Sequence, residues 1–214
     1  MHDNDRMNSI LEIAFDLFLE KGYSATSIRT ICQLAEIEAP TLYYFFNSKK
    51  GLFDAIATRL WNGYNLFSSD VLKKLADMEP LKKLYFIYRF SINYALTNPH
   101  DIKFYIRYSL FPPEELADNI KKHLRNLQLR KEQMTMKAIV EFIDKGIIKI
   151  EFLKAQYQYW NFINHCIYDV IFSEWKPDED ELIETWHSFV KYSYEIDELN
   201  YINKIKQGEF TNLL

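Results

Sequence analysis

The chain of 214 residues has few of the residues that interrupt helices or crosslink a fold. It contains five glycines, and no alternating apolar pattern lasts beyond a few residues, which argues against a sheet protein. Its two cysteines, Cys32 and Cys166, lie far apart on expected helix faces, which suits buried free thiols better than a disulfide framework. No apolar run approaches the roughly 20 residues that cross a bilayer, and the acidic N-terminus is unlike a secretory signal. We therefore expect a cytoplasmic protein without a membrane partner.

Excess positive charge is also missing. The net charge is −4, which argues against broad attraction to nucleic acid or anionic membranes and leaves any such contact to local placement of charge. With 48% hydrophobic and 26% charged residues the chain is long enough for a substantial core and is not disordered. No second His or Cys lies at ligand spacing beside His165, so we expect no metal, and no cofactor is indicated.

The most informative pattern present is an amphipathic helix followed by two short helices. Gly22 can end the first helix, and Thr26 or Ser27 can cap the second. Pro40 then suits the first turn of a third helix that ends near Phe46. This order is that of a helix-turn-helix, which commonly lays its second helix in the major groove of DNA.

The remaining long segments also read as helices. Ser48 is placed to cap a fourth helix, and prolines or a glycine separate the later ones. The expected ranges are 48–77, 80–98, 100–111, 114–145, 151–175 and 178–199. A polar tail over 200–214 is a candidate for a further short helix. The fold class is all-α.

The N-terminal region resembles the TetR/AcrR family of bacterial transcriptional repressors. The residues that carry the resemblance cover about the first quarter of the chain and are specific as a set: Ile10-Leu11, Ala14, Leu17-Phe18, Gly22-Tyr23, Thr26-Ser27-Ile28-Arg29, Ile31, Ala35, Thr41-Leu42-Tyr43-Tyr44-Phe45-Phe46, Lys49 and Leu52-Phe53. The segment 39–43 is also similar to the recognition helix of the tetracycline repressor.

The resemblance implies an architecture and a set of DNA contacts. Residues 1–50 would form a three-helix DNA-binding domain, and 51–214 a helical ligand-binding and dimerisation domain, joined by the linking helix 48–77. Base edges would face Pro40, Thr41 and Tyr44. Tyr43 and Lys49 would bind phosphates. The flanking DNA backbone would be held by Thr26, Ser27 and Arg29. Taken singly, the tyrosines would more often be packing residues, and Arg29 and Lys49 solvated charges.

Three departures from the family pattern bear on DNA binding. Glu36 stands where the family usually has a glycine in the turn, and Glu38 where it favours a serine-type cap. Residues 1–50 also hold five Lys or Arg against seven Asp or Glu, so the domain is not basic. We expect modest non-specific affinity and a shallow dependence on salt.

Aromatic residues are dense in the C-terminal half, where polar groups lie among the rings at helical spacing. An ordinary aromatic core explains most of them, and a pocket for a planar, largely apolar molecule is the other interpretation. The candidate pocket residues are Tyr88, Phe104, Tyr108, Tyr157, Asn161, Asn164, His165 and Tyr168.

A single recognition helix covers only a few base pairs, so specificity calls for a two-fold dimer that reads two half-sites. The last two long helices could pair with their copies as a four-helix bundle, although intrachain core is the alternative. The candidate interface residues are Tyr159, Phe162, Ile163, Ile167, Ile171, Leu182, Ile183, Trp186, Phe189 and Val190.

These observations favour a homodimeric repressor that binds a palindromic operator and is released by a small, largely apolar or aromatic effector. Activation instead of repression stays open, and the sequence does not name the effector, the operator or the regulated genes. A helical carrier or protein-interaction module that keeps the helix-turn-helix only as scaffold is the alternative. An enzyme is not expected, because Ser109 has no evident base and His165 and Cys166 point about 100° apart on a helix.

Overall fold

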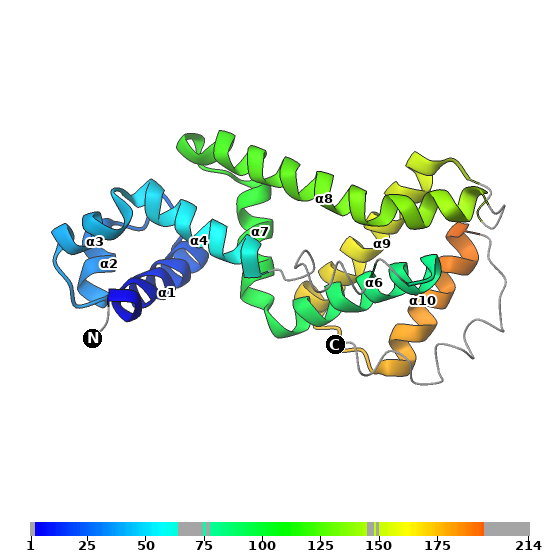
Figure 1. Ribbon diagram of the computed structural model, residues 1–214. Coiled ribbons are helices and arrows are strands. Elements are labelled where there is room, and N and C mark those ends of the chain that lie inside the picture. Colours follow the sequence, from blue (N-terminus) through cyan, green and yellow to red (C-terminus); the bar gives the residue numbers. More distant parts are fainter. Residues whose placement is uncertain (1–2, 64–74, 76–77, 145–147, 149, 195–214) are drawn as a thin grey trace. The chain divides into compact units, whose positions relative to one another are not determined.

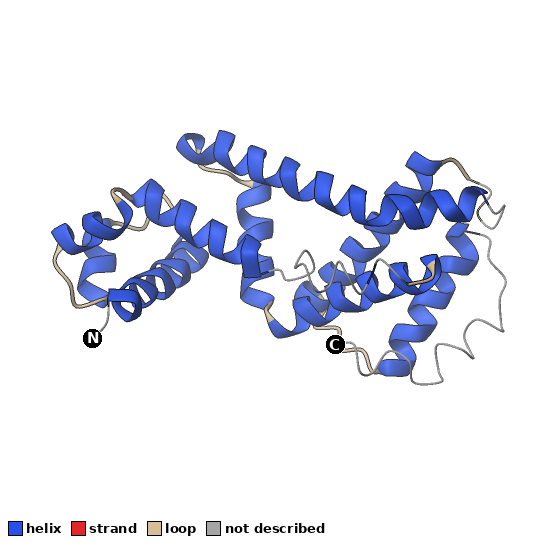
Figure 2. Cartoon of the chain, in the orientation of Figure 1, coloured by secondary structure: helices blue, strands red, loops and turns tan. Residues whose placement is uncertain are grey.

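The computed structural model describes residues 3–63, 75, 78–144, 148 and 150–194. Within these residues it is helical and contains no strand, which confirms the expected all-α class (Figure 2). None of the helices in the described part is both long and apolar enough to span a membrane. The chain divides into two compact units, which we call unit 1 (Met1–Asn65 and His100–Leu124) and unit 2 (Leu66–Pro99 and Arg125–Leu214).

Unit 1 begins with four helices in the order expected from the sequence (Figure 1). They are α1 (Asp3–Lys21), α2 (Ile28–Leu34), α3 (Ala39–Phe46) and α4 (Lys49–Gly63). The continuation of the linking helix expected as far as residue 77 lies outside the described residues. Unit 1 also takes in α7 (Pro99–Leu110), a 3₁₀ turn (Glu114–Leu116) and the first part of α8 (Ala117–Asp144). This compact unit thus includes residues 100–124 as well as the helix-turn-helix.

Aromatic side chains from α7 complete the core of unit 1. Phe104 stacks on Phe15 and Phe53, and Tyr108 packs edge-on against Phe53. The Tyr108 hydroxyl donates a hydrogen bond of 2.9 Å to the Phe18 carbonyl, which satisfies the one polar atom of this buried ring. Burial raises the pKa of Tyr108 to about 12. The core beneath the helix-turn-helix thus includes side chains of α7, which lie about 90 residues after α1 in the sequence.

Unit 2 contains α6 (Pro80–Thr97), most of α8, α9 (Phe152–Phe172) and α10 (Glu179–Tyr194). Buried tyrosine hydroxyls donate to backbone carbonyls of neighbouring helices. Tyr159 donates to the Leu84 carbonyl at 2.6 Å, and Tyr194 to the Ala155 carbonyl at 2.9 Å. These rings are therefore core residues with their polar atoms satisfied. The expected end of the last helix near 199 and the tail beyond it lie outside the described residues.

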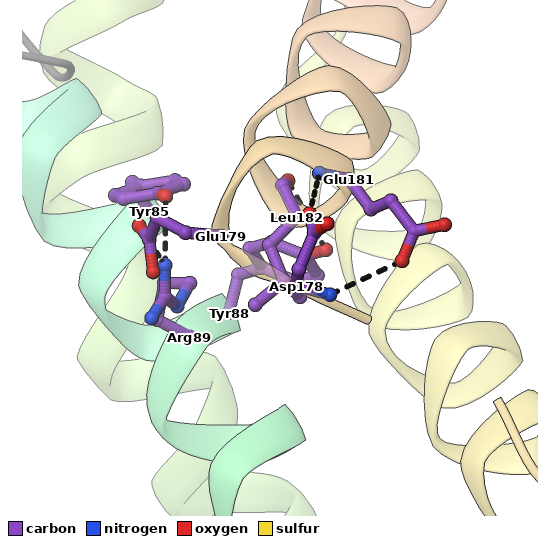
Figure 3. Close-up of polar contacts among 7 residues, drawn as sticks. All are labelled: Tyr85, Tyr88, Arg89, Asp178, Glu179, Glu181 and Leu182. Atoms are coloured by element: carbon purple, nitrogen blue, oxygen red, sulfur yellow. Dashed lines mark hydrogen bonds and ion pairs between the residues drawn. The ribbon is translucent and has the colours of Figure 1, made fainter. Parts of the chain in front are cut away.

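The start of α10 is fastened by a capping box and by α6 (Figure 3). The Asp178 carboxylate accepts the Glu181 N–H at 2.9 Å, and the Glu181 carboxylate accepts the Asp178 N–H at 3.1 Å.

Contacts with α6 also hold the start of α10. Arg89 on α6 forms an ion pair with Glu179 and donates to the Tyr85 hydroxyl at 3.3 Å. The Tyr88 hydroxyl donates to the Leu182 carbonyl at 3.4 Å. Local capping and tertiary contacts thus agree on where α10 begins.

The turn between α2 and α3 is a Schellman motif. The Ile37 N–H donates to the Cys32 carbonyl at 3.0 Å, and the Glu36 N–H to the Gln33 carbonyl at 3.4 Å. This geometry requires a positive φ at Glu36, and the structure has φ 52° there. The turn expected from the family pattern is therefore kept, although glutamate occupies the position that glycine adopts most easily.

Replacing Glu36 with glycine should stabilise unit 1. Relief of the left-handed strain, less the extra chain entropy of glycine, leaves a gain of about 0.5–1 kcal/mol in the free energy of unfolding. The measurement is urea unfolding followed by circular dichroism. Gln33→Gly, at an exposed position in the last turn of α2, is the control and should lower the same free energy by up to about 1 kcal/mol. Equal destabilisation by both variants would contradict the strain at Glu36.

Candidate nucleic-acid interface

The start of α2 is set by Ser27. Its backbone is extended (φ −98°, ψ 151°), and its hydroxyl accepts the Thr30 N–H at 3.0 Å, as expected of an N-cap. Ile31 and Cys32 are buried, whereas Arg29 lies on the exposed side of the helix. Ser27 and Arg29 are therefore accessible to a ligand outside unit 1.

Thr26 does not share this exposure. Its side chain is buried, and its hydroxyl lies 2.9 Å from the Gly22 carbonyl and 3.2 Å from the Leu17 carbonyl. The hydroxyl donates within the α1–α2 corner, so the expected contact between this side chain and a DNA backbone is not supported. The sequence could not separate Thr26 from Ser27, because both hydroxyls suit a helix start.

The helix α3 presents one face to the interior and one to solvent. Leu42 and Phe46 are buried in the core cluster of unit 1. On the opposite side Tyr44 is 76% exposed and Tyr43 45% exposed, and Pro40 is exposed in the first turn. Thr41 is half-buried. Two apolar anchors one turn apart thus direct the tyrosines outward.

The junction between α3 and α4 is tight. Asn47 has φ 60°, and its N–H donates to the Tyr43 carbonyl at 2.9 Å. The Ser48 hydroxyl then accepts the Gly51 N–H at 3.0 Å, which confirms Ser48 as a cap of the fourth helix. A Cβ on Gly51 would collide with the Phe46 carbonyl oxygen. Glycine at this position therefore permits the close approach that places the first turn of α4 beside α3.

Lys49 lies in that first turn with its ammonium 4.1 Å from the centre of the Tyr23 ring. Burial lowers the pKa of Lys49, and the nearby Glu115 carboxylate acts in the opposite direction. Burial and Glu115 together raise the pKa of Tyr23, so its hydroxyl stays neutral at physiological pH. The ring holds the lysine at the helix N-terminus, where positive potential from the helix adds to its charge.

A hollow of about 660 Å³ lies between α2 and α3. Arg29 contributes its positive charge to the lining, and Glu36 and Glu38 contribute two negative charges. Glu38 is the N-cap of α3 but makes no side-chain capping hydrogen bond. Cys32 also lines the hollow, and burial followed by the Glu38 charge raises the pKa of its thiol. The surface beside α3 is therefore mixed in charge, as the sequence indicated.

The residues expected to form one ligand pocket are not brought together. Phe104 and Tyr108 belong to the core of unit 1, and Tyr88 is buried against Phe162 and Trp186 in unit 2. Tyr157, Asn161 and Asn164 line a cavity of about 510 Å³ between α8 and α9 in unit 2. His165 lines a separate hollow between α9 and α10, and Tyr168 is exposed. Helical spacing does not say which helices pack together, so the grouping of these residues into one ligand site stays a prediction.

Most residues expected at a dimer interface lie in the chain's own core. Tyr159, Ile163 and Ile171 on α9 are buried, as are the α10 residues of the set: Leu182, Ile183, Trp186, Phe189 and Val190. Phe162 stacks on Phe189 with ring centres 4.2 Å apart, and Ile167 is half-buried. The apolar stripes expected to join two copies therefore join α9, α10 and α6 of one chain. This is the alternative that the sequence left open.

The outward faces of α9 and α10 were not identified from the sequence. On α9 the residues at positions 161, 165, 168 and 172 follow one another at helical spacing and are exposed. On α10 Ser188 and Tyr192 are exposed beside half-buried Thr185. Asn161, His165, Thr185, Ser188 and Tyr192 line one shared hollow of about 470 Å³. We call this surface, with Tyr168 and Phe172, the α9–α10 face.

Comparison with known proteins agrees with this geometry. The family model of the bacterial regulatory proteins of the tetR family matches residues 10–56, which run from within α1 to within α4 and include α2 and α3. The negative transcriptional regulator IcaR of the biofilm operon icaADBC, from Staphylococcus aureus, is 28% identical over 144 residues, which are 67% of this chain and 72% of the relative.

Two solved structures share the fold along most of the chain. NalD, a repressor of a multidrug efflux pump in Pseudomonas aeruginosa, has a TM-score of 0.67 at 20% identity over 87% of this chain and 95% of its own. AibR, solved with isovaleryl coenzyme A and operator DNA, has a TM-score of 0.62 at 18% identity over 90% of this chain and all of its own. Residues 10–56, which include the helix-turn-helix at 28–46, therefore match the tetR family of bacterial regulatory proteins, and the chain shares its fold with these two solved structures.

Proposed function

We propose that the protein is a repressor that binds a palindromic operator as a homodimer and releases it when a small effector binds unit 2. The observation that carries the proposal is the outward face of α3, where Pro40, Tyr43 and Tyr44 project from a helix anchored by Leu42 and Phe46. A short helix with exposed side chains after a helix-turn suits insertion into a major groove. The relative IcaR is named a negative regulator, which favours repression over activation.

The two sides of α3 and its neighbours suit different kinds of contact. Pro40, Thr41 and Tyr44 would meet base edges, where methyl and methylene groups can touch a thymine methyl. Tyr43, Ser27 and Arg29 would bind phosphates, which positions the helix without reading sequence. Lys49 would add a phosphate contact at the start of α4. Glu36 and Glu38 beside them keep non-specific attraction to DNA low.

Dimerisation supports this function because two half-sites are needed for a selective operator. We assign the contact between copies to the α9–α10 face, which exposes Tyr168, Phe172 and Tyr192. Tyr168 and Phe172 stack with ring centres 5.7 Å apart and form an exposed aromatic pair. A second copy applied to the same face would bury these rings in an isologous interface. The two long helices of each copy would then form a four-helix arrangement.

Control by an effector follows from coupling between the two units. Ligand binding in unit 2 would favour an arrangement in which the two recognition helices no longer match the half-sites. Because the coupling free energy is reciprocal, operator DNA would weaken effector binding by the same factor. The carrier or interaction module that keeps the helix-turn-helix as scaffold stays the second candidate, favoured by Glu36, Glu38 and the acidic balance of residues 1–50.

Loss of Tyr44 should weaken operator binding. We expect Tyr44→Ala to lower affinity about tenfold for duplexes selected from a random library by the wild-type protein, because a base contact is lost. Fluorescence anisotropy with the selected duplex provides the measurement. The matched control is Tyr157→Ala, since Tyr157 is 70% exposed but lies on α9 in unit 2. If no duplex is enriched over random DNA, the scaffold alternative is supported instead.

Two charge changes should act in opposite directions on all DNA sequences. Lys49→Ala should weaken binding uniformly and reduce the slope of log affinity against log salt by about 1, because one phosphate contact is lost. Glu38→Gln should strengthen binding a few-fold at low salt, since a carboxylate near the phosphates is removed. Salt titrations with selected and scrambled duplexes measure both effects, with Lys154→Ala on α9 as control. Equal slopes for wild type and Lys49→Ala would place Lys49 away from phosphate.

The α9–α10 face should hold the dimer together. Phe172→Glu and Tyr192→Glu should each weaken self-association about tenfold or more, because a charge must be desolvated in the interface. Sedimentation velocity over a concentration series measures the change. Leu153→Glu is the control, because Leu153 is also exposed on α9 but points about 100° away from Phe172. If only Leu153→Glu causes dissociation, the interface lies on the other side of α9.

A further inference from the structure

One lysine interrupts the inward stripe of α8. Apolar or small side chains recur at Leu124, Leu127, Ala138 and Phe142, and Lys131 occupies the position one turn after Leu127. Lys131 is only partly exposed, and its ammonium lies 5.0 Å from the centre of the Trp160 ring on α9. A cation on the inward side of a helix normally has a carboxylate partner, because removing it from water is costly.

No carboxylate of the described residues pairs with Lys131. Burial lowers the pKa of its ammonium to about 8, and no neighbouring charge contributes. The ring face of Trp160 supplies attraction to the cation, but a ring is a weaker partner than an anion. The positive charge is therefore held in unit 2 at a net cost to the unliganded protein.

Two further polar atoms beside this lysine lack partners within the described part of the chain. The indole Nε1 of Trp160 and the Oε1 of Gln156 are both buried and make no hydrogen bond, although Nε2 of Gln156 donates to the Glu132 carbonyl at 3.0 Å. Each residue is only 6% exposed. Buried polar atoms without partners are rare, and a bound ligand is one way to satisfy them.

Gln156 and Trp160 line a cavity of about 510 Å³ between α8 and α9, and Lys131 lies next to it, against the Trp160 ring. The cavity is also lined by apolar side chains that include Leu129, Met136, Phe152 and Leu153. Glu132 is the one acidic residue in the lining. The lining also includes the amides of Gln128, Gln133, Asn161 and Asn164, so apolar and polar side chains converge in a volume that is in the range of small-molecule sites.

We propose that this cavity binds an amphipathic organic anion, with its acidic group at Lys131 and the Trp160 Nε1 and its apolar chain between α8 and α9. The inference rests on the proposed effector response and names the chemical class of the effector. An anion supplies what the site lacks: it neutralises the lysine and accepts from the indole N–H. The chain of such a molecule would cover the apolar lining, and a donor on the ligand could reach Gln156.

The test compares ligands of equal length with and without charge, using the full chain. Isothermal titration should show that dodecanoate binds at least about tenfold more tightly than dodecanol, the cost of losing a charged hydrogen bond. Dodecanoyl coenzyme A has no free carboxylate, and its phosphates carry the negative charge. If it binds more tightly than dodecanoate and its binding still depends on Lys131, the phosphates are the group that Lys131 binds. Equal binding of dodecanoate and dodecanol overturns the proposal.

Variants locate the anion. Lys131→Met keeps the length of the side chain and should remove the preference for dodecanoate over dodecanol, whereas Lys131→Arg should keep it. Trp160→Phe keeps an aromatic face for the lysine but removes the indole N–H, and it should reduce the preference in part. Lys154→Met, an exposed lysine on α9, should leave it unchanged. An unchanged preference in Lys131→Met overturns the assignment of the anion to this lysine.

A stability readout separates the ligand role from a structural one. Without ligand, Lys131→Met should raise the melting temperature, because an uncompensated charge is removed, and the wild type should regain the difference when dodecanoate is added. A lower melting temperature for the unliganded Lys131→Met protein would mean that the lysine stabilises the fold, and would overturn the proposal. If the anion binds but operator affinity does not change, the proposed effector response is contradicted, whereas the anion site in unit 2 is still supported.

Discussion

The burial of Leu42 and Phe46 is the contact on which the exposed surface of α3, proposed to bind DNA, depends. The helix α3 has eight residues, too few to be stable in water on its own, so its position is set by what these two side chains contact. Both lie in the same cluster as residues of α1 and α4, and Gly51 lets the start of α4 approach the end of α3. With that face fixed, the outward direction of Tyr43 and Tyr44 follows from helix geometry.

In the proposed complex with DNA, the charges around α3 favour selectivity over affinity. A basic domain would bind any duplex, whereas here Arg29 shares a hollow with Glu36 and Glu38, and Lys49 lies near Glu115. Affinity then has to come from well-placed contacts, including tyrosine hydroxyls that carry no charge. Glu36 also shows that a favoured turn can be kept at a cost in strain, because the Schellman hydrogen bonds of the turn require the positive φ.

The buried tyrosine hydroxyls of unit 2 form hydrogen bonds within the chain, so the few buried polar atoms that lack a partner there stand out. Tyr88, Tyr159 and Tyr194 each donate to a carbonyl of a neighbouring helix, so their abundance needs no ligand to explain it. Lys131 and Trp160 differ, because their polar atoms lie inside without a comparable acceptor. A site built on such a deficit stores free energy that a ligand of complementary charge can recover.

The sequence by itself determined the helical class, the limits of most helices and the identity of the N-terminal motif. Caps, prolines and apolar periodicity are local signals, and Ser27, Pro40 and Ser48 act as those signals indicate. Local signals also predicted the strained position at Glu36. The direction of Tyr43 and Tyr44 could be expected from the spacing of Leu42 and Phe46, because helix periodicity alone relates them.

Only the tertiary structure decided which faces meet. Thr26 and Ser27 are equivalent as local signals, but packing buries the first and exposes the second. The stripes of Tyr159, Ile163 and Trp186 look equally suited to a partner chain and to an intrachain core, and the contact of α9 with α6 and α10 selects the core. Phe104 and Tyr108 join a helix-turn-helix far away in sequence for the same reason. Periodicity shows that a face must be covered, but what covers it depends on contacts between distant segments.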